Sequence, residues 1–119
     1  MTKTILVVDD EDDIRTTVKQ LLEREKYTVL TAIDGDDCLV KAAHHKNIDL
    51  ILLDVMMPGT SVREVIQRLP HLKIAYLTVV RTTEAEKEKL LQEKNVVGFI
   101  QKPFDISDFI KTVKKLLQE

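Results

Sequence analysis

Three aspartates stand where two apolar runs of the sequence end, and together they could bind a divalent cation. Asp9 and Asp10 directly follow the run Ile5–Val8, and Asp54 closes the run Ile48–Leu53. Runs of this length are typical of buried strands in a parallel sheet. Carboxylates at the ends of such strands meet at one edge of the sheet, where they repel one another unless a cation joins them. The pattern therefore predicts a metal site with a carboxylate available for chemistry.

The three aspartates suggest two separate roles. Asp10 and Asp54, helped by Asp9 and a backbone carbonyl, would form the all-oxygen ligand set that suits Mg²⁺. Asp54 could also act as a nucleophile, attacking a phosphoryl group to give an aspartyl phosphate. The simpler alternative for Asp54 is a strand-ending residue before a Pro-Gly turn. Glu11 to Asp13 are interpreted as a solvated turn that leads into a helix, whose first turn favours acids.

Two further polar residues end predicted strands. Lys102 is the only cation at the carboxyl end of a strand, and its position beside the carboxylates favours an ion pair over the usual surface location of lysine. Thr78 is weak evidence alone, because threonine is common in strands. In this context its hydroxyl could donate to a phosphoryl oxygen. Phosphoryl transfer requires mainly positioning and charge neutralisation, which Mg²⁺ and a cationic side chain could supply.

Alternating strands and helices must position these residues. Periodicity, capping residues and charge patterns predict the elements. The expected strands are Thr4–Val8, Tyr27–Thr31, Ile48–Leu53, Lys73–Leu77 and Val96–Gln101, and the helices cover about 12–25, 35–46, 61–69, 83–94 and 106–118, the last capped by Asp105. Five such units predict an α/β fold, a doubly wound five-stranded parallel sheet. Ligands of such sheets bind beyond the carboxyl ends of the strands.

Composition limits the possible function classes. The 119 residues form one domain, with 44% hydrophobic residues, 4% aromatic residues and a net charge of −2. No basic stripe indicates a direct nucleic-acid partner, and no apolar run is long enough to span a membrane. The lone Cys38 fits a reducing cytoplasm and is interpreted as a semi-buried helix residue rather than a nucleophile. The three histidines, His44, His45 and His71, are expected on the surface rather than around zinc.

Four segments, in this order, resemble the receiver domains of two-component response regulators, such as the chemotaxis regulator. They are VVDDE at 7–11, LDVMMPG at 53–59, LT at 77–78 and GFIQKPF at 98–104. The resemblance covers essentially the whole chain, so residues 1–119 are expected to form a single receiver domain. It implies a flavodoxin-like fold with strand order 2-1-3-4-5.

The resemblance also implies roles for the acidic residues. Asp54 would be the phosphoacceptor for the phosphohistidine of a sensor histidine kinase. Asp10, Asp54 and the Met56 backbone carbonyl would bind Mg²⁺ directly, with Asp9 acting largely through water. The domain would not be an enzyme in the usual sense, but a phosphoacceptor that assists its own phosphotransfer and dephosphorylation.

A conformational switch is implied as well. Lys102 would pair with the phosphoryl group, with a cis bond to Pro103. Thr78 would move to bond the phosphoryl group and Phe99 would swing inward behind it, although plain core packing explains Phe99 equally well. The change would alter the face made by the helix at about 83–94, the strand Val96–Gln101 and the last helix. That face would signal to an effector protein or to a histidine phosphotransfer domain.

The sequence departs from the family pattern at several positions. Val79 replaces the usual Ala or Gly, which adds bulk where the phosphoryl group would sit. The loop after Pro58 lacks the common Asp-Gly pair, and the spacing from Asp54 to Thr78 is shorter than usual. Met56 and Val80 are apolar and cannot orient a water molecule, so a long-lived phosphoryl group is expected.

Three alternatives remain at this point. The first is a pseudo-receiver, a protein-interaction module that acts without phosphorylation because of Val79. The second is a Mg²⁺-dependent hydrolase of the haloacid dehalogenase type, which needs a second acid where this chain has Met56. The third, a flavodoxin, is disfavoured because acids after the first strand would repel the flavin phosphate.

Overall fold

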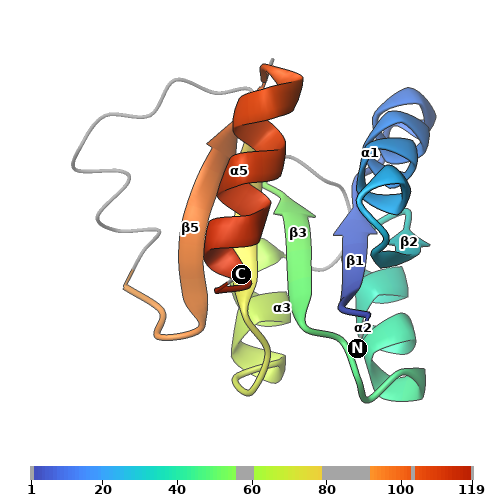
Figure 1. Ribbon diagram of the computed structural model, residues 1–119. Helices are drawn as coiled ribbons and strands as arrows, with labels where there is room; N and C mark the ends of the chain where they lie inside the picture. The colour runs from blue at the N-terminus through green and yellow to red at the C-terminus, as the bar shows by residue number, and fades with distance from the viewer. Residues whose placement is uncertain (1, 56–60, 79–91, 103, 119) are drawn as a thin grey trace.

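Five parallel strands form one sheet in the order β2-β1-β3-β4-β5 (Figure 1). The computed structural model describes residues 2–55, 61–78, 92–102 and 104–118, and the backbone only of Thr78. The strands are β1 Thr4–Val8, β2 Thr28–Ala32, β3 Leu50–Asp54, β4 Ile74–Thr78 and β5 Val96–Gln101. The helices are α1 Asp12–Arg24, α2 Gly35–His44, α3 Val62–Arg68 and α5 Ile106–Leu116. The predicted doubly wound α/β fold and its strand order are confirmed.

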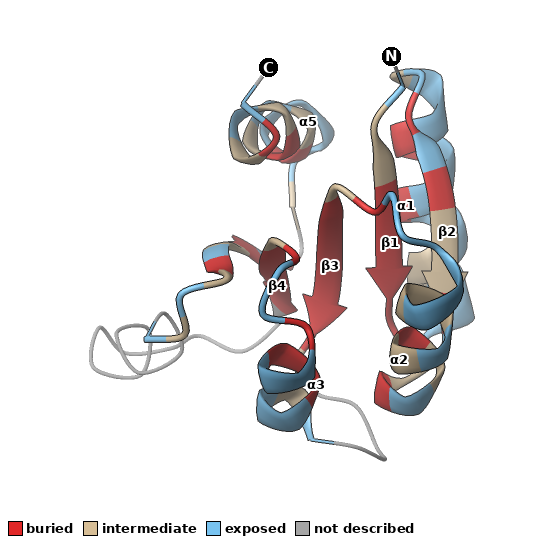
Figure 2. Cartoon of the chain, turned by 90° about the horizontal axis from the view of Figure 1, so that it is seen from below, coloured by how far each residue is buried: buried red, intermediate tan, exposed pale blue. Residues whose placement is uncertain are grey.

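The sheet separates two apolar layers because successive strand residues point to opposite faces. Ile5 and Val7 of β1 pack in a core shared with α1 and α5, whereas Leu6 and Val8 pack in a core shared with α2 and α3. Figure 2 shows α2 and α3 on one side of the sheet and α1 and α5 on the other. Every residue of β3 is buried, since helices cover both faces of this central strand.

Three of the helices in the described ranges are capped by the side chain of the residue just before their first residue. Asp34 accepts a hydrogen bond from the backbone N–H of Asp37 at 2.8 Å, and Ser61 does the same for Glu64 at 3.2 Å. The predicted cap at Asp105 is present and accepts from Asp108 N at 3.1 Å. Each such cap stabilises its helix by about 1 kcal/mol. These caps fix where α2, α3 and α5 begin.

Three predicted strands are displaced in the structure, the fourth by one residue, to Ile74–Thr78 from the predicted Lys73–Leu77. The second begins at Thr28 rather than Tyr27, because Lys26 has a positive φ of 71° and the turn from α1 is completed only at that point. The third is Leu50–Asp54 rather than Ile48–Leu53. Ile48 is buried but lies before the first residue of β3 that pairs with a neighbouring strand. Its apolar side chain therefore packs in the core without taking part in strand pairing.

Other boundaries differ by one or two residues, and two further predictions change or fall outside the described residues. Most of the helix predicted at 83–94 lies outside the described residues, and Gln92–Asn95 form turns and a bend, so it does not extend to Lys94. Cys38 is completely buried rather than semi-buried. None of the helices in the described ranges is long and apolar enough to cross a membrane.

Candidate functional site at the carboxyl edge of the sheet

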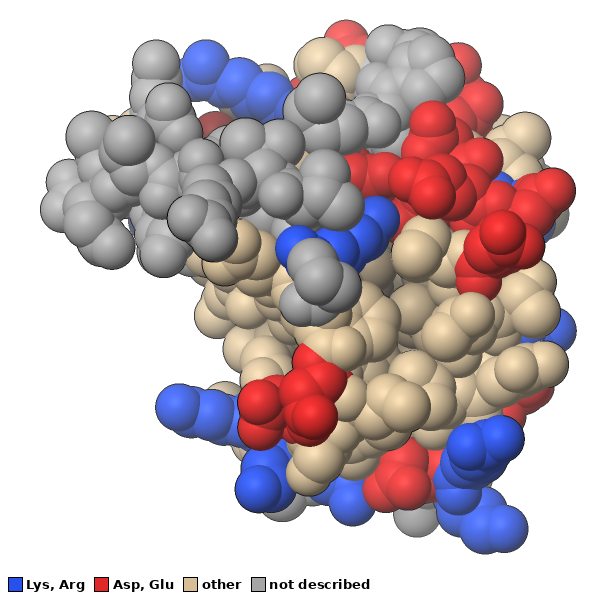
Figure 3. Space-filling view, turned by 90° about the horizontal axis from the view of Figure 1, so that it is seen from above, with Lys and Arg blue, Asp and Glu red and all other residues tan. Residues whose placement is uncertain are grey.

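The parallel pairing of β1 with β3 brings the three aspartates together. Val8 pairs with Leu53, so the residues that follow, Asp9 and Asp54, reach the same edge of the sheet. One carboxylate oxygen from each of Asp9, Asp10 and Asp54 lies within 4.8 Å of the other two. Figure 3 looks onto this edge and shows acidic side chains gathered there, with basic side chains nearby. The convergence predicted from the apolar runs is therefore present.

Lys102 reaches this cluster from the end of β5. Its Nζ lies 2.5 Å from Oδ2 of Asp9 and 3.9 Å from Oδ2 of Asp54. The pair is desolvated, because the Lys102 side chain is 6% exposed and the Asp9 side chain is 0% exposed. Asp9 also accepts a hydrogen bond at its other oxygen from the backbone N–H of Glu11, at 3.0 Å. The structure thus places Lys102 in an ion pair, as its position in the sequence predicts.

The charges of the cluster suit a divalent cation. The Asp9–Lys102 pair is neutral as a whole, which leaves two negative charges on Asp10 and Asp54 within 4.8 Å. Asp54 is buried and Asp10 is exposed, so one ligand of the site lies in the protein interior and another faces the solvent. Carboxylate oxygens that share one Mg²⁺ ion lie roughly 3–4 Å apart, close to the spacing here. A hard, all-oxygen donor set of charge −2 therefore fits Mg²⁺.

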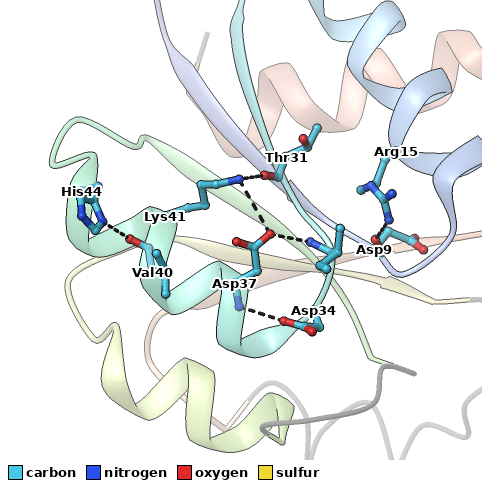
Figure 4. Close-up of polar contacts among 9 residues, drawn as sticks. Asp9, Arg15, Thr31, Asp34, Asp37, Val40, Lys41 and His44 are labelled. Carbon is cyan, nitrogen blue, oxygen red and sulfur yellow. Dashed lines mark hydrogen bonds and ion pairs between the residues drawn. The ribbon is translucent and has the colours of Figure 1, made fainter.

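Arg15 fixes the backbone of the acidic loop, and sequence reasoning missed it. Its Nη1 donates to the Asp9 carbonyl oxygen at 2.6 Å, and its Nη2 pairs with Asp12 (Figure 4 shows the Asp9 contact). The Asp9 N–H donates to the Ala32 carbonyl at 3.2 Å, which ties the loop to β2. The three-residue spacing from Asp12 to Arg15, typical of a pair on one helix turn, was the available signal.

The backbone of Thr78 lies at the same carboxyl edge of the sheet. Thr78 ends β4 and pairs with Gln101, while its neighbour Leu77 pairs with Asp54. The Thr78 side chain lies outside the described part of the structure. Met56, Val79, Val80 and Pro103 lie outside the described residues altogether, so the predictions made for them stay predictions.

Phe99 packs against an aromatic ring that the sequence analysis did not connect with it. Its ring centroid is 5.4 Å from that of Tyr76, with the planes tilted by 42°. Phe99 is half-buried and Tyr76 is buried, and burial, with a smaller contribution from Glu93, raises the pKa of the Tyr76 phenol to about 12. Phe99 is therefore part of a ring pair on one face of the sheet, with part of its surface still exposed.

The other reactive side chains lie apart from the aspartates. Burial, with a smaller effect of Asp37, raises the pKa of the Cys38 thiol to about 12, so this cysteine is protonated at neutral pH. His44, His45 and His71 are exposed, as expected. Across the described ranges, the aspartate trio is the only cluster of three or more acidic, Cys or His side chains that could share a metal ion.

Comparison with known proteins gives a consistent result. The family model of the response regulator receiver domain matches residues 5–114. The transcriptional regulatory protein ResD of Bacillus subtilis is 39% identical over 96% of this chain and 48% of its own length. The alkaline phosphatase synthesis transcriptional regulatory protein PhoP of the same organism is 39% identical over 99% of the chain and 50% of its length. The chain thus spans about half the length of these relatives.

Solved structures match over almost the full length of both chains. The chemotaxis protein CheY4 of Vibrio cholerae has a TM-score of 0.85 and 30% identity, covering 98% of this chain and 99% of that one. The response regulator TrrA of Thermotoga maritima, in complex with Mg²⁺ and BeF, has a TM-score of 0.81 and 34% identity, covering 97% and 99%.

Proposed function

The chain belongs to the response regulator receiver family, and on that premise we propose that it is a phosphorylation-controlled switch with Asp54 as the phosphoacceptor. The observation that carries the proposal is the buried Asp54 carboxylate, which lies 3.9 Å from Lys102 and beside two further carboxylates. The phosphoryl donor would be the phosphohistidine of a sensor histidine kinase. The receiver of the signal would be an effector protein or a histidine phosphotransfer domain, in the cytoplasm.

The transfer itself is a nucleophilic substitution at phosphorus. An Asp54 carboxylate oxygen attacks the phosphorus, the bond between phosphorus and the donor's imidazole nitrogen breaks, and the imidazole leaves. Asp54 is the suitable nucleophile because it is held at the end of the central strand and lies 3.9 Å from the Lys102 ammonium, whereas Asp9 is held against that ammonium at 2.5 Å. The product is an acyl phosphate on Asp54.

Lys102 neutralises negative charge at the acceptor. Its ammonium lies between Asp9 and Asp54, so it can keep its contact with Asp9 while pairing with the new phosphoryl group. Asp10, Asp54 and the Met56 carbonyl would hold Mg²⁺, with Asp9 acting largely through water. Bound there, the ion would neutralise charge on the phosphoryl oxygens and help to orient the phosphoryl group.

Thr78 and Phe99 would carry the signal from the phosphorylated site to the protein surface. Thr78 would bond the phosphoryl group and Phe99 would change its position behind it, which would alter the exposed face of β5 and α5. The contact between Phe99 and Tyr76 supports this role, because any movement of Phe99 changes the packing of a buried neighbour. The domain would turn over no external substrate, and would assist only its own phosphotransfer and dephosphorylation.

Intact-protein mass spectrometry tests the proposal. The protein is incubated with acetyl phosphate, with Mg²⁺ or with EDTA, beside Asp54→Ala and the control Asp13→Ala, which removes an exposed carboxylate outside the trio. We expect one phosphoryl group, dependent on Mg²⁺, on the wild type and on Asp13→Ala, and none on Asp54→Ala. If neither acetyl phosphate nor a phosphorylated histidine kinase gives the adduct, the proposed function is refuted and the pseudo-receiver alternative is favoured.

A further inference from the structure

A hollow separates the carboxyl ends of α2 and α3, at the edge of the sheet opposite the aspartates. Both helices lie on the same face of the sheet (Figure 2), and the hollow has a volume of about 500 Å³. Its lining residues are Leu39, Ala42, Ala43, His45, Lys46, Arg68, Leu69, His71 and Leu72. It is formed wholly by residues the structure describes, and nothing in the proposed phosphoryl chemistry uses it.

The floor of the hollow is apolar. Leu69 and Leu72 are 8% exposed and belong to the core on this side of the sheet, while Leu39 and Ala42 pack against that core and are half-buried. Ala43 is exposed at the margin and contributes only a methyl group there. The hollow can therefore accept an apolar side chain from outside.

The polar side chains among the described residues of the rim are those of Lys, Arg and His. Lys46 and Arg68 are exposed on opposite sides, accompanied by the exposed imidazoles of His45 and His71. Among the described lining residues none is acidic. Arg68 already lies 3.7 Å from Glu64, but both of these side chains are about half exposed, so the pair is weak and leaves Arg68 available. The favourable interaction of cations with helix carboxyl ends explains Arg68 in part, but it does not explain the apolar floor.

We propose that this groove binds an acidic, amphipathic peptide segment of a partner protein. An apolar side chain would enter the floor, and flanking carboxylates would pair with Lys46 and Arg68. The chain as a whole has a net charge of −2, so binding of an acidic segment must come from this local surface rather than from general attraction. A nucleic acid offers phosphates but no aliphatic side chain for the floor, and a flat membrane surface does not fill a hollow.

Fluorescence anisotropy with a defined probe tests the groove. The probe is a labelled helical peptide with leucine at every third or fourth position and glutamate between, and its controls replace either the leucines by serine or the glutamates by lysine. We expect saturable binding of the probe alone. Equal binding of the serine peptide would overturn the proposal, because the floor would then contribute nothing.

Three variants locate the binding site. Lys46→Glu with Arg68→Glu reverses the rim, and Ala43→Trp fills the hollow without changing its charge. The matched control is Lys19→Glu with Arg24→Glu, which makes the same charge change on the exposed face of α1. We expect affinity to fall at least tenfold for the rim variant and at least fivefold for Ala43→Trp, and less than twofold for the control. A similar loss in the control would overturn the proposal.

Competition and sedimentation exclude the other occupants. A DNA duplex and phosphatidylserine vesicles are expected to displace the probe poorly, and the wild-type chain alone is expected to sediment as one species at all concentrations. Strong displacement by DNA or vesicles, or self-association lost in Ala43→Trp, would overturn the assignment to a partner peptide. Circular dichroism of each variant confirms that it is folded.

Discussion

Removing Lys102 should cost the protein a large part of its stability, because it leaves Asp9 buried and unpaired by any cation. At an effective dielectric constant of about 20, charges 2.5 Å apart attract by about 7 kcal/mol and charges 3.9 Å apart by about 4 kcal/mol. The desolvation of the buried charges offsets most of this attraction, and removal of one partner of a buried ion pair costs about 3–5 kcal/mol. We therefore expect Lys102→Ala to lower the free energy of unfolding by about 3 kcal/mol in EDTA.

Urea unfolding followed by circular dichroism measures this change. With an m value of roughly 2 kcal/mol/M, the midpoint should fall by about 1.5 M. The matched control is Lys114→Ala, which breaks an ion pair with Glu25 of 2.9 Å whose side chains are 44% and 33% exposed. Such an exposed pair contributes less than about 1 kcal/mol.

A double-variant cycle separates the ion pair from other effects of truncation. Lys102→Met in an Asp9→Asn background removes both charges, so its cost should be at least about 2 kcal/mol smaller than in the wild-type background. If Lys102→Ala destabilises the protein no more than Lys114→Ala does, or if the cycle shows no coupling, the burial argument for the site is wrong.

Three further predictions concern other parts of the molecule. Asp10→Asn removes one of three mutually close carboxylates, so in EDTA it should raise the free energy of unfolding by about 1 kcal/mol, measured from the urea midpoint. Mg²⁺ should no longer stabilise this variant against urea. An unchanged effect of Mg²⁺ on its midpoint would contradict this prediction. Cys38, whose pKa burial raises from 9.0 to about 12, contributes stability that is fully present below pH 9 and lost as the pH rises towards 12, since only the unfolded chain releases the proton there. The difference in unfolding free energy between wild type and Cys38→Ala should therefore change above pH 9 and be constant below it; a flat difference throughout would contradict the burial argument. Asn95→Ala removes two hydrogen bonds that Nδ2 donates, to the carbonyl of Ile66 at 3.0 Å and to that of Leu69 at 2.9 Å. The free energy of unfolding, measured with heat or urea, should fall by about 2 kcal/mol. A fall of less than about 0.5 kcal/mol would show that water replaces these hydrogen bonds.

The fold and the meeting of the aspartates could be predicted because they depend on local patterns. Apolar runs identify buried strands, and parallel strands place the residues after them at one edge, so Asp9, Asp10 and Asp54 had to converge. The precise start of β3 was not predictable from composition, because Ile48 is buried by packing and not by strand pairing.

The contacts within the site were harder to predict. The position of Lys102 favours an ion pair, but its choice of Asp9 over Asp54 as the nearer partner depends on how β5 and β1 present their ends in space. The contact of Arg15 with the Asp9 carbonyl and the contact of Phe99 with Tyr76 are likewise tertiary. The groove between α2 and α3 depends on the packing of two helices far apart in sequence, which no periodicity encodes.

Identification of the phosphorylated residue tests the central claim most directly. The protein is phosphorylated with acetyl phosphate and Mg²⁺, the acyl phosphate is reduced with borohydride to an alcohol, and peptides are sequenced by mass spectrometry. We expect the reduced side chain at position 54, with Asp9 and Asp10 unchanged. Reduction at Asp9, Asp10 or any other carboxylate, with Asp54 intact, would contradict it.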